Sequence, residues 1–63
     1  MEFFEWIHGE NFQFSKIGNQ QFLISSENKE YIIYKKKDWV CAEEVPEELL
    51  ENLGAAIDKR TRQ

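Results

Sequence analysis

The stretch FQFSKIGNQQFLIS, residues 12–25, decides the fold of this chain. Apolar and polar side chains alternate along its first part, and Gly18-Asn19 then offers a two-residue turn with glycine in the first position. Alternation with a period of two is typical of a β-strand, and a Gly-first dipeptide between two such runs is typical of a hairpin. The stretch therefore predicts two antiparallel strands, with Phe14 opposite Leu23.

Further strands follow in the same meander. A polar run closes the second hairpin and leads into YIIYK, residues 31–35, and a turn at Lys37-Asp38 leads into WVCA, residues 39–42. Clusters of Ser, Asn, Asp and Gly between apolar runs are typical of turns. The chain from 11 to 43 is therefore predicted to form an antiparallel meander of three or four short strands.

Carried through loops of even length, this pairing sorts the side chains onto two faces, and both faces come out apolar. One face collects Phe12, Phe14, Leu23, Ile32, Tyr34, Trp39 and Cys41. The other collects Ile17, Phe22, Ile24, Tyr31, Ile33, Val40 and Ala42. An antiparallel sheet with one face in water shows apolar-in, polar-out alternation. This sheet does not, so each face is expected to need a cover.

One cover is an amphipathic helix predicted over residues 46–60. Pro46 suits the first helical position. The acidic residues of the first turn and the basic residues of the last turn both interact favourably with the helix dipole. At ~100° per residue, the apolar side chains fall within an arc roughly 120° wide. They are Leu49, Leu50, Leu53, Ala56 and Ile57. Gly54 lies at the margin of this arc, so either a close approach to the sheet or a break in the helix is expected there.

The N-terminal segment, residues 1–9, brings more apolar surface. It is predicted to form either one or two helical turns ended by Gly9 or a short extra strand. Its large apolar residues are Phe3, Phe4, Trp6 and Ile7. So short a segment covers only part of the second face, and a contiguous exposed apolar patch usually marks an interface. These four residues and Trp39 are the predicted partner-binding residues, and a homodimer through the face opposite the C-terminal helix is expected.

Length and composition limit the other function classes. Sixty-three residues make one small domain, which buries only about 60% of its unfolded surface. Cys41 is the lone cysteine, so an internal disulfide is excluded and a cytoplasmic, reducing environment is favoured. His8 is the lone histidine, and zinc, calcium and phosphate-loop motifs are absent from the sequence. We therefore expect a chain that is not an enzyme and has no metal, cofactor or catalytic residue.

The remaining sequence features concern membranes and signals. The longest apolar runs are about four residues, far below the ~20 needed to span a bilayer. The acidic start, MEFFEWIHGE, lacks the basic region of a secretory signal. Small size without a signal suits a bacterial or phage cytosolic protein.

The run Lys35, Lys36 and Lys37 supports a rival function. Three ammonium groups on a hairpin tip can neutralise phosphates, and nearby aromatic rings can stack on unpaired bases. Lysines in this position also keep a turn soluble and protect an edge strand from aggregation. The 12 acidic and 8 basic residues give a net charge of −4, which disfavours nucleic acid as partner. The sequence therefore predicts an α+β protein-interaction module, regulatory in role, that binds a protein or itself, with a nucleic-acid binder as the alternative.

Overall fold

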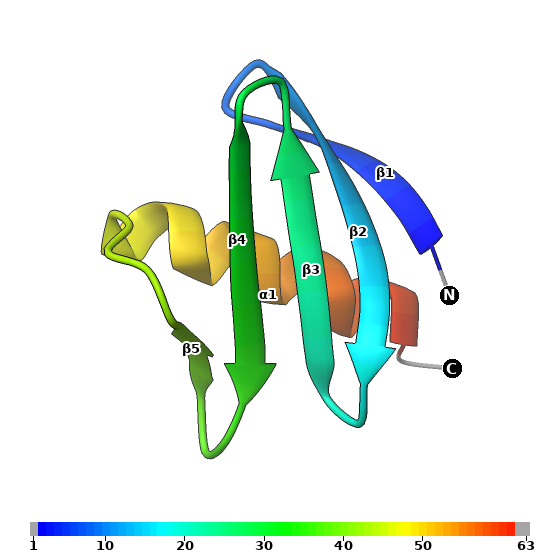
Figure 1. The fold of residues 1–63 in the computed structure, drawn as a ribbon, viewed down its shortest axis with the longest axis vertical. Helices are drawn as coiled ribbons and strands as arrows, with labels where there is room; N and C mark the ends of the chain where they lie inside the picture. Colours follow the sequence, from blue (N-terminus) through cyan, green and yellow to red (C-terminus); the bar gives the residue numbers. More distant parts are fainter. Residues whose placement is uncertain (1, 62–63) are drawn as a thin grey trace.

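The computed structural model describes residues 2–61, and within them the chain forms five strands and one helix (Figure 1). The elements are β1 (Glu2–Ile7), β2 (Glu10–Gly18), β3 (Gln21–Ser26), β4 (Lys29–Lys35), β5 (Trp39–Cys41) and α1 (Glu47–Thr61). All neighbouring strands are antiparallel and follow chain order in a single meander. The predicted α+β class is confirmed, but the sheet has five strands rather than three or four.

The additional strand is the N-terminal segment. β1 pairs with β2 along its whole length, with Phe3 opposite Phe14, so the predicted strand is confirmed and the helical alternative is wrong. His8 and Gly9 make the turn with φ of 54° and 73°. Two successive positive φ values are the condition for the hairpin turn whose twist matches that of the strands.

The β2–β3 hairpin differs by one residue from the predicted pairing. Phe14 lies opposite Ile24, not Leu23, and the turn comes one residue later than predicted. A register shift just before Gly18 and a left-handed φ of 59° at Gln20 accommodate the change. Because side chains alternate, a slip of one residue moves a whole strand's side chains to the opposite face. The predicted sorting of β2 against β3 is therefore wrong.

The β4–β5 connection is the second correction. Lys35 pairs with Trp39, so the loop has three residues instead of the predicted two. The Lys36 amide donates a hydrogen bond of 3.1 Å to the Asp38 carbonyl within this loop. An odd loop length reverses the sorting of β5, just as the late turn reverses that of β2.

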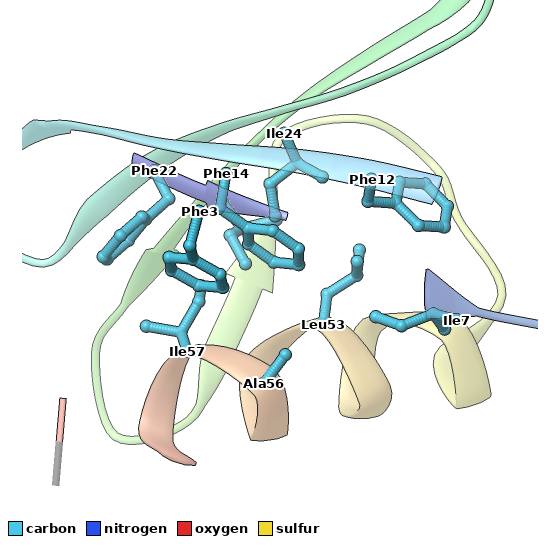
Figure 2. Packing of buried hydrophobic residues seen from close by; sticks show 10 residues of the cluster. Phe3, Ile7, Phe12, Phe14, Phe22, Ile24, Leu53, Ala56 and Ile57 are labelled. Atoms are coloured by element: carbon cyan, nitrogen blue, oxygen red, sulfur yellow. The ribbon is translucent and has the colours of Figure 1, made fainter. Parts of the chain in front are cut away.

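With these two registers, Phe12, Phe14 and Phe22 lie on the face covered by α1 (Figure 2), and Trp39 packs against them. The buried cluster consists of Phe3, Ile7, Phe12, Phe14, Phe22, Ile24, Ile33, Leu53, Ala56 and Ile57. The rings of Phe3 and Phe14 stack with centroids 4.5 Å apart. The two faces are therefore unequal: one is closed by the helix, and the other is a mixture of apolar and polar side chains.

The predicted phase of the helix is confirmed, because Leu53, Ala56 and Ile57 are buried while Glu51 is exposed. A Cβ atom added to Gly54 would lie 2.7 Å from Cγ and 2.9 Å from Nε1 of Trp39, and closer still to Cδ1. The helix continues unbroken through this position. Of the two reasons predicted for the glycine, the close approach is confirmed.

Candidate interaction surface

The sheet face opposite α1, which we call the open face, is not covered by any other element in the part of the chain that the structure describes. Figure 1 views the molecule from this side, with α1 behind the strands. Phe4 is 57% exposed, Trp6 72% and Ile32 40%. Strand alternation places three further, half-buried apolar residues on the same face. They are Leu23, Tyr34 and Val40.

These apolar residues form two groups at diagonally opposite corners of the open face. Ile17, at the irregularity in β2, is also 52% exposed and belongs to neither group. The β1 corner consists of Phe4 and Trp6, which lie toward the His8 turn. The β4 corner consists of Leu23, Ile32, Tyr34 and Val40. In register, Leu23 is opposite Ile32 and Tyr34 is opposite Val40, so the β4 corner is continuous across three strands.

A band of uncharged polar residues separates the two corners. Strand alternation places Asn11, Gln13 and Ser15 of β2, and Ser25 of β3, on the open face. The carboxylates of Glu2 and Glu30 fall near its rim by the same alternation. The middle of the open face is therefore uncharged and its charges lie at the rim, and depletion of charged residues from the centre is a feature of protein–protein interfaces.

The predicted partner-binding residues lie partly in the core and partly on the open face. Phe3 and Ile7 belong to the buried core, and Trp39 is half-buried between β5 and α1. Phe4 and Trp6 are left on the open face. Sequence reasoning missed the β4 corner as a candidate because the wrong hairpin register mixed it with the core residues of β2 and β5.

Side chains at the C-terminal end of α1 form hydrogen bonds and ion pairs with the edge strand β1. Arg60 Nη2 donates hydrogen bonds of 3.3 Å to the Phe4 carbonyl and to Glu5 Oε1, and Lys59 Nζ donates one of 3.1 Å to Glu5 Oε2. The Arg60 guanidinium also lies 4.8 Å from the centroid of the Phe3 ring. The Lys59 hydrogen bond lowers the pKa of Glu5, and Arg60 adds to this effect against the opposing effect of burial. These contacts hold the backbone that carries Phe4 and occupy an acceptor on an edge strand.

The three lysines of the β4–β5 hairpin do not form one surface. Lys35 Nζ lies 3.7 Å from Asp58 Oδ1 on the side of α1. Lys36 Nζ lies 5.9 Å from the centroid of the Tyr34 ring, and Lys37 is exposed at the tip. The charge of Lys35 is therefore partly neutralised within the chain, which weakens the predicted phosphate-binding cluster.

His8 and Cys41 lie in different parts of the molecule and have different neighbours. His8 Nε2 is 2.9 Å from Asn52 Nδ2, beside a shallow groove of about 360 Å³ between β1 and α1. Burial raises the pKa of the Cys41 thiol, and Glu43 Oε1 lies 3.8 Å from its sulfur. A thiol that stays protonated is a poor nucleophile. Residues 2–61 contain no group of three or more His, Cys, Asp or Glu side chains placed to hold a metal ion.

Comparisons with protein families, curated proteins and solved structures find no match to this chain. Within residues 2–61, no helix has both the length and the apolar character needed to cross a membrane.

Proposed function

We propose that this chain is a non-enzymatic protein-interaction module whose open face is the docking surface. The observation that carries the proposal is the exposure of Trp6 and Phe4, at 72% and 57%, on the same face as a second apolar group, the β4 corner. Tryptophan and other large aromatic residues supply much of the binding energy at protein interfaces, where they fill pockets on the partner.

The open face also has the rigidity that a docking surface needs. The Phe4 backbone is paired with β2 on one side and accepts a hydrogen bond from Arg60 on the other. Its neighbours in the strand, Phe3 and Glu5, are held by the core and by the ion pairs with α1. A preorganised surface loses less conformational entropy when it binds a partner.

Photo-crosslinking inside cells tests the proposal. A photoreactive phenylalanine analogue at position 4 should form covalent adducts with protein, whether another copy of this chain or a different one. The same analogue at position 51, on the exposed side of α1, is the matched control and should form few. The Ile32→Glu substitution on the open face should suppress the adducts from position 4. Equal adduct yields from positions 4 and 51 would show that the open face is not a docking surface.

Nucleic-acid binding is the rival function, and its support is Lys36 beside the Tyr34 ring together with the exposed Lys37. With Lys35 held by Asp58, about two phosphate contacts remain, which release too few counterions to hold a complex at physiological salt. We expect oligonucleotide binding to vanish near that salt concentration. Micromolar binding there, lost when all three lysines are replaced by alanine, would favour the rival.

A further inference from the structure

We propose that a second copy of this chain occupies the open face, with the β1 corner of each protomer packed against the β4 corner of the other. This inference rests on the proposed function, because it names the partner of the same surface. The two corners differ in shape: exposed Trp6 and Phe4 project from an edge strand, whereas the β4 corner is a broader area over three strands. The projecting β1 corner of one protomer can therefore pack on the broader β4 corner of the other. A two-fold axis makes this contact twice.

The strand registers give the direction of that axis. Strands lie about 4.8 Å apart and rise about 3.4 Å per residue, so the centres of the two corners are separated by about 14 Å across the strands and about 14 Å along them. The line between the corners therefore runs diagonally over the sheet. A two-fold axis that lies between the two sheets places the β1 corner of one copy over the β4 corner of the other only if it runs perpendicular to this line, along the other diagonal of the sheet. The strands of the two sheets then cross at about 90°, which is one of the two usual modes of sheet-on-sheet packing.

The residues along this axis suit a close approach of the two sheets. Ser15 and Ser25 lie nearest the diagonal, and each would meet its own copy. Both side chains are small and uncharged. Glu2 and Glu30 fall toward the two ends of the diagonal, where solvent reaches them and each lies near its own copy. With a net charge of −4 on each protomer, the two copies repel one another, and added salt should tighten the dimer by screening.

A stable dimer needs only part of the surface that this chain exposes. A standard interface buries about 800 Å² on each partner, which is under a fifth of the 4520 Å² that this chain exposes. The described residues measure 26 × 22 × 19 Å, and the open face is one broad side of them. Burial of this face would remove the most exposed aromatic side chains from water.

Sedimentation equilibrium at micromolar concentration is the first test. The wild-type chain should have twice the 7.6 kDa mass of one chain, and its dissociation constant should fall as salt is added. Trp6→Ser should sediment as a single chain with an unchanged circular dichroism spectrum, because Trp6 is 72% exposed and outside the core. Glu51→Ser, on the exposed side of α1, should keep the wild-type mass. A single-chain mass for the folded wild type overturns the dimer, whereas adducts of Phe4 with a different protein would still support the proposed function.

Crosslinking between copies tests the diagonal axis. Ser25 and Gln21 both lie on the open face of β3, so Ser25→Cys and Gln21→Cys in a Cys41→Ala background form a matched pair. Facing sheets are about 10 Å apart; in the diagonal arrangement Ser25 lies over its own copy, whereas Gln21 lies about 18 Å to the side of its copy. A thiol reagent that spans about one sheet spacing should therefore crosslink only the Ser25→Cys variant. Equal crosslinking of both variants would indicate an axis parallel to the strands and overturn the proposed contact between corners.

Discussion

At the scale of single residues, the contact between Gly54 and Trp39 sets how closely α1 approaches β5. The Trp39 ring is held on three sides: by Gly54, by an edge-to-face contact with Phe22 at 6.1 Å, and by a 3.4 Å hydrogen bond from Nε1 to Asp58. Lys35 Nζ lies 5.3 Å from the same ring. An indole with so many neighbours has little room to move away from a new methyl group.

We therefore expect Gly54→Ala to lower the free energy of unfolding by about 1–3 kcal/mol, the usual result of overpacking. Helix propensity alone predicts the opposite sign, a gain of about 1 kcal/mol. Urea unfolding measures the difference. In a Trp39→Leu background the same substitution should be neutral or stabilising, because the obstructing ring is gone. An equal loss in both backgrounds would mean that the contact with Trp39 is not the reason for the glycine.

The ion pairs of Glu5 predict a pH dependence of stability. Lys59 and Arg60 lower the pKa of Glu5 from its ordinary value of 4.5, so the folded state binds this proton less well than the unfolded state. The resulting stabilisation is present above pH 4.5 and is lost as the pH falls through the lowered value. The stability difference between wild type and Glu5→Gln should therefore be largest near neutrality and shrink in acid.

Thermal unfolding over a series of pH values measures this difference. Glu51→Gln removes a carboxylate from the exposed side of α1 and is the matched control, whose profile should run parallel to that of the wild type. A gap between wild type and Glu5→Gln that stays constant down to strongly acidic pH would show that the ion pairs do not stabilise β1 against α1.

At the scale of elements, periodicity predicts what lies within a strand or helix better than how neighbouring strands are aligned. The helix, its buried face and the β3–β4 pairing follow from patterns that extend over many residues. The bulge before Gly18 and the three-residue loop after Lys35 each change the strand register by one residue. Both the predicted and the observed registers leave apolar side chains on both faces of the sheet, so the sequence pattern alone does not choose between them. Packing decides, because the observed registers bring Phe12, Phe14 and Phe22 together with Phe3 under α1.

The helix also provides a test of which contacts hold the two layers together. Leu53 has no exposed surface and lies in the centre of the cluster in Figure 2, so Leu53→Ala should lower the free energy of unfolding by about 2–5 kcal/mol. Glu51→Ala, two residues earlier and exposed, should change it by less than about 0.5 kcal/mol. Chemical denaturation of the two variants measures both values. Similar losses would place the buried side of α1 elsewhere.

At the scale of the whole molecule, the two faces of the sheet have different roles. The face under α1 holds the buried cluster and closes the core within one chain. The open face keeps Phe4 and Trp6 in solvent, so they contribute little to the stability of a single chain. The sequence shows that apolar surface is left over, but not which residues form it, because that depends on the two register shifts. The sequence therefore predicts only part of the candidate site: it identifies Phe4 and Trp6 as interaction residues but does not identify the β4 corner.

This division of roles predicts how thermal stability depends on concentration. If two copies bury the open face, unfolding also separates them, and mass action raises the melting temperature as the chain is concentrated. For a chain of this length we expect about 5 °C per tenfold increase in concentration. Trp6→Ser removes the contact but not the core, so its melting temperature should stay constant and equal that of the wild type at high dilution. Calorimetry over two decades of concentration measures both slopes, with Glu51→Ser expected to follow the wild type. A wild-type melting temperature that does not change with concentration would contradict the dimer, and equal slopes for wild type and Trp6→Ser would place the association on another surface.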